Sequence, residues 1–279
     1  MFGTKRRRLL RERRRAGFRP EWRAIVEQRL PHWSYLTDEE RERLEQLTST
    51  LMFDTRWEAA NGFELTDEIQ VVIASQAALL ILGLPDDSYR NIRSILVHPT
   101  TLVLNGEHSQ VPGLASREPV PIVGLAEHRG PVLIVWDTAL HDARHPGTGH
   151  NVVFHEFAHQ LDMLDGTVDG TPPLATQEQF ARWVEVCTQV YDQVVDGTAG
   201  RTLDPYAGIN PGEFFAVVTE AFFDRPAALR SEHRDLYEVL SEFYRQDPAA
   251  RTATTPSSDP PTTAPSSDPP TTTPSSTRD

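Results

Sequence analysis

The spacing of hydrophobic and polar positions predicts helices at both ends of the central part of the chain. Thr37 is followed three residues later by Glu40, which is the pattern of a capping box and predicts a helix to about Leu51. A largely apolar stretch at 69–84 is long enough for a buried helix, and Pro85 follows it. Further helices are expected at 21–30, 149–164, 176–195, 211–223 and 233–245.

Short apolar runs between these helices have the composition of strands. They lie at 94–97, 101–104 and 131–136, and polar, turn-rich segments separate them. The region from 137 to 148 is expected to be a loop. A small central sheet flanked by helices, with a largely helical C-terminal half, predicts an α+β fold. The strand at 131–136 is expected to offer an exposed edge to which an extended peptide could add.

The two ends of the chain differ in composition from the middle. Residues 1–23 hold ten basic and two acidic side chains, whereas residues 253–279 repeat a nine-residue Pro/Ser/Thr pattern without large apolar side chains. Such a repeat has nothing to bury and cannot offset the entropy cost of ordering. We therefore expect a basic, disordered tail at 1–19, one folded domain at 20–249 and a disordered tail at 250–279.

Charge and composition exclude several classes of protein. The net charge is −13 although the N-terminus is basic, so the acidic core is not expected to bind nucleic acid. Binding of nucleic acid through residues 1–19 stays an alternative. Cys187 is the one cysteine, which excludes an internal disulfide framework.

Nothing in the sequence predicts a membrane span or export. The longest apolar stretch, at 71–84, is too short to cross a bilayer. The pair Arg6-Arg7 loosely resembles a twin-arginine signal, but the arginine-rich segment at 11–15 stands where such a signal needs an apolar region. A cytoplasmic protein is expected.

The chemistry-bearing motif lies in the helix expected at 149–164. His155-Glu156-x-x-His159 is a zinc signature, because residues four apart lie one turn apart on the same helix face. Two imidazoles placed in this way can bind one zinc ion, and Glu156 can reach a water on that ion. Apolar residues cover almost the whole helix, so polar groups on it need a partner when buried. We expect one Zn²⁺ per chain.

A catalytic zinc site needs a third protein ligand. A well-known class of zincins places a third histidine six residues after the second, but that position holds Asp165. Asp165 and Asp204 stay candidates. Glu213 is favoured because Asn210 and Pro211 begin a helix that is apolar nearly all round, in which a carboxylate needs a cation or several donors.

Two further acidic residues are candidates for orienting the histidines. Glu220 lies seven residues after Glu213 on the same helix face, and it could accept a histidine N–H. Asp162 lies seven residues after His155 and could do the same. The alternative for Asp162 is an ordinary polar residue near a helix end. The alternative for Glu213 is capping of its own helix.

These segments resemble the Mlc titration factor A family of bacterial zinc peptidases. The resemblance rests on the stretch from His155 to Asp162, on Tyr206-Ala207 and on Pro211-x-Glu213 through Glu220. The segments at 62–65 and 243–248 also match, so that the similarity extends over about 20–248. The stretch at 155–162 resembles the catalytic helix of anthrax lethal factor as well, a zincin with a tyrosine seven residues before its glutamate ligand.

The resemblance implies a zincin-like metallopeptidase of the gluzincin type. It implies that His155, His159 and Glu213 bind zinc, that Glu156 is the general base, and that Tyr206 lies near the reacting carbonyl. It also implies aminopeptidase activity on peptides and, in enteric relatives, binding to a transcriptional repressor. The alternative from a different class is a regulatory protein-binding module whose zinc site is structural or vestigial.

Overall fold

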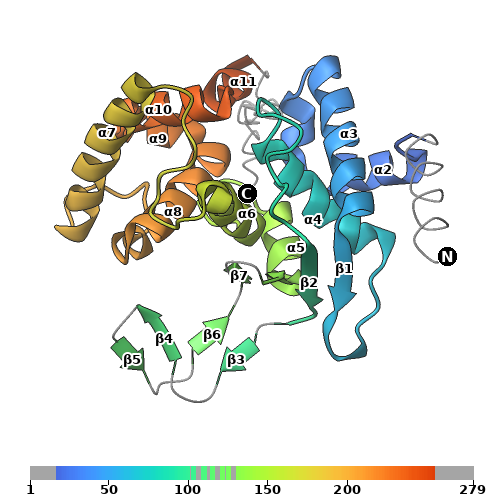
Figure 1. The fold of residues 1–279 in the computed structure, drawn as a ribbon. Helices are drawn as coiled ribbons and strands as arrows, with labels where there is room; N and C mark the ends of the chain where they lie inside the picture. The colour runs from blue at the N-terminus through green and yellow to red at the C-terminus, as the bar shows by residue number, and fades with distance from the viewer. Residues whose placement is uncertain are drawn as a thin grey trace, which may run out of the picture.

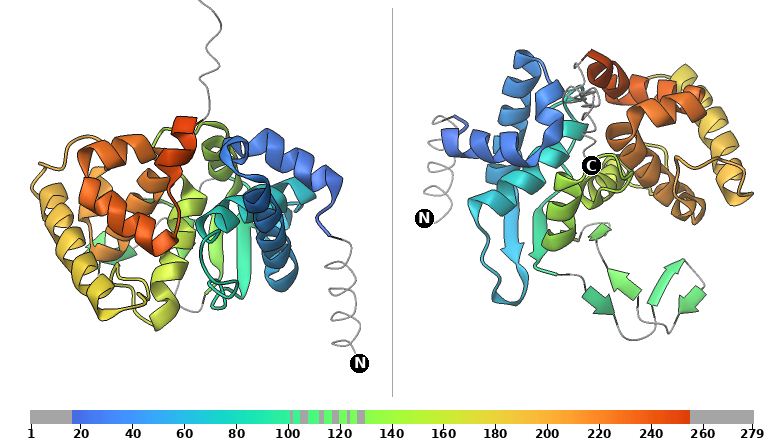
Figure 2. Two further views of the ribbon diagram at one scale, coloured as in Figure 1. Left: turned by 90° about the horizontal axis from the view of Figure 1, so that it is seen from above. Right: turned by 180° about the vertical axis from the view of Figure 1, so that it is seen from behind.

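The computed structural model describes residues 17–100 and 130–254, together with short strands between residues 102 and 126. Two groups of helices lie on opposite sides of the central helix α6 (Val152–Asp162), as both Figure 1 and Figure 2 show. The first group contains α2 (Pro20–Arg29), α3 (Asp38–Asp54) and α4 (Asp67–Leu80). The second contains α7 (Gln177–Val195), α8 (Pro211–Asp224), α9 (Pro226–Glu232), α10 (Arg234–Tyr244) and α11 (Pro248–Thr254).

The first group confirms the predicted helix starts. Thr37 and Glu40 form both hydrogen bonds of the capping box at the start of α3, with N···O distances of 3.0 and 3.2 Å. The Thr66 side chain accepts from Ile69 N at the start of α4. Helix α4 is buried along most of its length, and it ends at Leu80 rather than at 84. After Leu80 the backbone continues in turns, in which Ile81 N, Leu82 N and Leu84 N donate to the carbonyls three residues before them. Gly83 packs directly against the Tyr244 backbone, where an added Cβ would lie 2.4 Å from the carbonyl oxygen.

The central sheet has the strand order β1-β2-β8-β7. Strands β1 (Arg56–Ala59), β2 (Ser94–His98) and β8 (Val132–Val135) are parallel, and β7 (Gly124–Ala126) is antiparallel to β8. This small sheet among helices confirms the α+β fold. The prediction of an exposed edge at 131–136 is wrong, because β8 has β2 on one side and β7 on the other.

The strand predicted at 101–104 belongs to a different sheet. Strand β3 (Leu102–Leu104) pairs with β6 (Val120–Ile122), and β4 (His108–Val111) pairs with β5 (Leu114–Ser116). These two-stranded sheets lie apart from the central sheet (Figure 1). Thr101 is outside the described residues.

Helix α5 (Trp136–Arg144) replaces the loop expected after β8. The prediction of a loop is wrong because Ala139 and Ala143, four residues apart, form a small buried face that lets the helix pack closely. His141, which was expected in that loop, lies in α5, and His145 ends the helix. The turn-forming Pro146 and Gly147 come only after it.

The second group of helices confirms the predicted helical C-terminal half. The helices expected at 176–195, 211–223 and 233–245 correspond to α7, α8 and α10, while α9 and α11 were not predicted. Helix α11 reaches Thr254, past the boundary expected at 249. Residues 1–16 and 255–279, the larger parts of the tails predicted at 1–19 and 250–279, lie outside the described residues. Within the described part of the chain, no helix has both the length and the apolar character of a membrane span.

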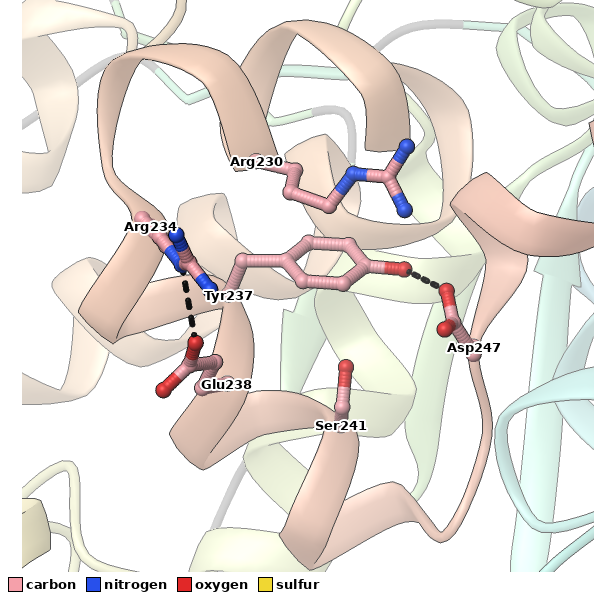
Figure 3. Close-up of a pocket in the computed structure, with 6 residues that line it drawn as sticks. All are labelled: Arg230, Arg234, Tyr237, Glu238, Ser241 and Asp247. Atoms are coloured by element: carbon pink, nitrogen blue, oxygen red, sulfur yellow. Dashed lines mark hydrogen bonds and ion pairs between the residues drawn. The ribbon is translucent and has the colours of Figure 1, made fainter. Parts of the chain in front are cut away.

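The segment between α10 and α11 joins the two groups of helices. The Tyr237 hydroxyl donates to Asp247 Oδ1 at 2.5 Å (Figure 3). Both residues line a surface pocket of about 530 Å³. The buried Gln246 side chain donates to the carbonyl oxygens of Leu79 and Leu80 at 3.0 and 3.1 Å. These carbonyls lie at the C-terminal end of α4, and Leu79 O also accepts from Leu82 N at 3.4 Å.

We expect Gln246→Ala to lower the free energy of unfolding by about 1–3 kcal/mol, because the carbonyls of Leu79 and Leu80 lose the buried Gln246 amide as a donor. Gln189→Ala is the control, since Gln189 is exposed on α7 and its loss should change stability by less than about 0.5 kcal/mol. Urea denaturation of the two variants measures the difference. Equal stabilities would show that Gln246 does not hold the two groups together.

Candidate metal centre

Helix α6 is buried between the two groups of helices and carries the predicted motif. Asn151 caps it, accepting from Phe154 N at 3.0 Å. Phe154, Phe157 and Leu161 are fully buried on its other faces. His155 and His159 lie on one face with their ring centroids 4.9 Å apart. The helix therefore presents both imidazoles in the same direction, as the spacing predicted.

Helix α8 packs against α6 and brings Glu213 to the histidines. Asn210 caps α8 by accepting from Glu213 N at 3.0 Å, and Pro211 occupies its first turn. Glu213 Oε2 lies 3.1 Å from His155 Nε2 and 3.6 Å from His159 Nε2. One potential ligand atom from each of the three residues lies within 4.8 Å of the other two. Neither Asp165 nor Asp204 belongs to this group.

Glu220 contacts the other side of the His155 ring. It lies on α8, seven residues or about two turns after Glu213. Its Oε1 is 2.8 Å from His155 Nδ1, and its Oε2 accepts from Asn151 N at 2.5 Å. A carboxylate only accepts, so Nδ1 carries the hydrogen and the ring orientation is fixed. His155 Nε2 then points toward Glu213 and His159. This arrangement suits a metal, which needs a lone pair at Nε2 and a held hydrogen at Nδ1.

His155 and Glu213 shift each other's pKa in opposite directions. Burial alone would lower the pKa of His155, but the hydrogen bonds with Glu213 and Glu220 outweigh it and hold that pKa well above the usual range. Burial would likewise raise the pKa of Glu213, but the two histidines hold it at about 2. The ionised carboxylate of Glu213 therefore favours the protonated, positively charged form of His155.

Glu156 is buried beside this group and lacks a partner. Its side chain is 4% exposed, and its Oε2 makes no hydrogen bond. Burial raises the pKa of Glu156 to about 8; His155 opposes the rise, while Glu213 and Glu220 add to it. A buried carboxyl without a hydrogen-bond donor is costly, and no hydrogen bond within the described residues compensates for this cost at Glu156 Oε2.

Asp162 and His159 are close in sequence on α6 but are not joined by a hydrogen bond. His159 Nδ1 and Asp162 Oδ1 are both buried without a partner. Asp162 Oδ2 accepts from Gly170 N at 2.9 Å. Burial raises the pKa of Asp162 to about 6. An unpaired donor and an unpaired acceptor therefore remain one turn apart on the same helix.

Tyr206 lies at the open side of the group. It belongs to a 3₁₀ turn at Pro205–Gly208, where Asp204 Oδ1 accepts from Tyr206 N at 2.8 Å. Its ring centroid is 6.1 Å from that of His155, and the residue is 39% exposed. Burial of part of the side chain, with Glu213 and Glu156 nearby, raises its pKa to about 12. The phenol is therefore a hydrogen-bond donor at neutral pH.

Gly170 was missed in the sequence and links the loop after α6 to the start of α8. Its N–H holds Asp162, and its carbonyl accepts from Trp183 Nε1 at 3.1 Å. Its φ is +77°, and an added Cβ would lie 2.3 Å from Pro211 O. The sequence signal was Asp169-Gly170, a turn dipeptide that gives no information on which distant backbone it meets.

The histidines outside the motif have other partners. His150 Nε2 lies 3.6 Å from Asp204 Oδ2 and is exposed, while His141 and His145 stack with centroids 4.3 Å apart. His32 and His233 interact with the carbonyl oxygens of Phe223 and Ala199 at 3.1 and 2.7 Å. None of these side chains joins the group formed by His155, His159 and Glu213.

Comparisons with known proteins point to one family. The sequence model of the glucose-regulated metallo-peptidases M90 matches residues 3–245. A Synechocystis protein described as uncharacterized is 36% identical over 82% of this chain and 85% of its own length. Mlc titration factor A of Serratia proteamaculans is 30% identical over 80% of this chain and 86% of its own length. The Mlc titration factor A of Yersinia enterocolitica is 30% identical over 83% and 87%.

We expect Gly170→Ala to displace the start of α8 and to weaken metal binding, because the new methyl group would collide with the Pro211 backbone. Gly166→Ala is the matched control, since Gly166 has φ +100° but nothing within 4 Å of an added Cβ. Both variants carry backbone strain of about 1–2 kcal/mol. Titration with a divalent metal should separate them, and equal affinities would exclude the link through Gly170.

A second prediction concerns Glu156 in the metal-free protein. Its pKa of about 8 in the folded state lies above the value of 4.5 for an unperturbed glutamate. The folded state therefore holds the proton more tightly, and unfolding free energy should fall as pH rises from about 4.5 to about 8. Glu156→Gln should lose less stability over this window than the wild type. Urea denaturation at pH 5 and pH 8 measures the loss of unfolding free energy in both proteins. Equal losses in the two proteins would contradict a raised pKa at Glu156.

Proposed function

This chain belongs to the glucose-regulated metallo-peptidase family M90, and on that premise we propose that it is a zinc peptidase with one Zn²⁺ per chain. His155, His159 and Glu213 would hold the ion. The observation that carries the proposal is the convergence of three ligand atoms within 4.8 Å beside a buried, unpartnered Glu156. Two imidazoles and one carboxylate form a ligand set of catalytic zinc sites.

The residues fit this ion. His155 already donates Nδ1–H to Glu220, so Nε2 is the nitrogen available to a metal. When bound, zinc would act as a Lewis acid on the scissile carbonyl and lower the pKa of a water. Three protein ligands leave a coordination position open for such chemistry.

Glu156 is proposed as the general base. It would take the proton of the attacking water and give it to the leaving amine, a role worth about 10²–10⁴ in rate. A positive ion next to Glu156 would favour the carboxylate form that a base needs. The phenol of Tyr206, protonated at neutral pH, would donate to the oxygen of the carbonyl as negative charge develops there.

Glu220 and Asp162 are proposed to orient the two histidine ligands. Glu220 contacts His155 directly. His159 Nδ1 and Asp162 Oδ1 are both buried without a hydrogen-bond partner, and Asp162 is proposed as the acceptor for His159. Carboxylates in such positions typically contribute 10–100-fold to metal affinity.

The finer properties are proposed from the relatives. Aminopeptidase-type action in the cytoplasm, on peptide or protein substrates, is the proposal that the family resemblance supports. A transcriptional repressor partner is proposed from the resemblance to the same family, to which the two relatives named Mlc titration factor A belong. The acidic net charge of −13 supports a core that does not bind nucleic acid.

The second candidate is a regulatory binding module with a structural zinc site. A structural site has no need of a general base, and such sites are usually closed by four ligands. The buried, unpartnered Glu156 favours the peptidase instead.

We expect Glu156→Gln to keep about one zinc per chain but to lower kcat by about 10²–10⁴. Glu213→Ala should lose both zinc and turnover, and Glu185→Gln, at an exposed glutamate of α7, is the control. Metal analysis and hydrolysis of aminoacyl chromogenic substrates and of longer peptides measure these effects.

Three outcomes would overturn parts of the proposal. Normal zinc binding by Glu213→Ala would exclude Glu213 as the third ligand. Zinc binding without hydrolysis of any substrate by the wild type would favour the regulatory module. Cleavage of longer peptides at internal bonds only would replace aminopeptidase action with endopeptidase action.

A further inference from the structure

The first backbone N–H groups of α6 are held by buried carboxylates from two other helices. Asp142, on α5, accepts from Val152 N through Oδ2 at 2.9 Å. Glu220, on α8, accepts from Asn151 N through Oε2 at 2.5 Å. Asp142 and Glu220 are 9% and 5% exposed. The N-terminal end of the motif helix is therefore fixed from both sides.

Asp142 is costly to bury and has no other evident use. Burial raises its pKa to about 6; the Val152 N–H opposes the rise, nearby Glu220 adds to it, and His141 and His150 oppose it. Asp142 does not belong to the group of potential metal ligands. The Asn151 side chain caps α6 at Phe154 N, and Asp142 accepts from a different N–H of the same helix start, at Val152.

The N–H that Asp142 holds lies in the same turn as the contacts of His155. His155 N donates to Asn151 O at 2.9 Å. Glu220 joins Asn151 N to His155 Nδ1, at 2.5 and 2.8 Å. The position of Asn151 therefore affects both parts of His155: the backbone through the Asn151 carbonyl, and the imidazole through Glu220. A shift of Asn151 would move the carboxylate that orients the imidazole.

Helix α4 supplies a third support at the same point. The Asn151 side chain donates to Gln76 Oε1 at 2.8 Å, and Gln76 Nε2 donates to Val72 O at 3.1 Å. Gln76 and Asn151 are both buried. Three different helices therefore converge on Asn151 and Val152, the N-cap and the first residue of the motif helix.

We propose that Asp142 is a positioning residue for the metal centre: by holding Val152 N–H, it fixes Asn151 and hence the Glu220–His155 contact. The inference rests on the proposed function only in taking His155 as a metal ligand. Asp142 acts through Val152 and Glu220, and it contacts neither the metal ligands nor a substrate. Its loss lowers metal affinity before it unfolds the helix.

The test compares zinc affinity and the visible absorption spectrum of the Co²⁺-substituted protein. Asp142→Ala should bind zinc about 10–100-fold more weakly and should shift the Co²⁺ bands, which report ligand geometry. Asp142→Asn keeps an acceptor oxygen and should restore both properties. Thr37→Ala is the control, because it removes a comparable cap at Glu40 N of α3 and should reduce stability without changing zinc affinity or spectrum.

Unchanged zinc affinity and Co²⁺ bands in Asp142→Ala would overturn the proposal and leave Asp142 with a role in stability alone. If Asp142→Ala does not fold, hydrogen exchange in the wild type decides. The Val152 amide of the metal-free protein should be as protected as the amides in the middle of α6. Rapid exchange of that amide would overturn the proposal. A wild type that binds no zinc would contradict the proposed function, while the exchange measurement would still test the bond to Asp142.

Discussion

The packing of α8 against α6 is the contact on which the rest of the candidate centre depends. Both helices are apolar nearly all round, so most of their few polar side chains are buried and meet one another. Glu213, Glu220 and Asp224 lie along the facing side of α8. Glu213 and Glu220 meet the histidine side chains of α6. Asp224 accepts from Gly147 N and Gly149 N at 2.8 and 2.6 Å, which fixes the loop that leads into α6.

Local sequence predicted the parts of this contact that follow helical spacing. His155 and His159 are four residues apart, and Glu213 and Glu220 are seven apart on one face, so each pair could be placed before the fold was known. The burial of both helices was also readable from their apolar composition. Glu213 was favoured as a partner of the histidines because a carboxylate in a buried helix needs a cation or several donors.

The parts that could not be predicted depend on contacts between segments distant in sequence. Asp142 reads as a polar residue in a turn-rich region, and only the packing of α5 beside α6 gives it a partner. Gly170 reads as a turn glycine, although its closest neighbour is Pro211. Strand β7 was not expected beside β8, because three residues carry too little pattern to identify a strand. The end of α4 was predicted too late in the sequence. Gly83 packs against Tyr244, which is distant in the sequence, so the local pattern could not predict this contact.

The pairing of His155 with Glu213 has a consequence for how the centre is filled. In the metal-free protein the imidazole is held in its cationic form by two carboxylates, so an incoming divalent ion must expel hydrogen ions before it can bind. Occupancy is therefore an exchange of one kind of cation for another. Acidic surroundings favour the hydrogen ions, and alkaline surroundings favour the metal.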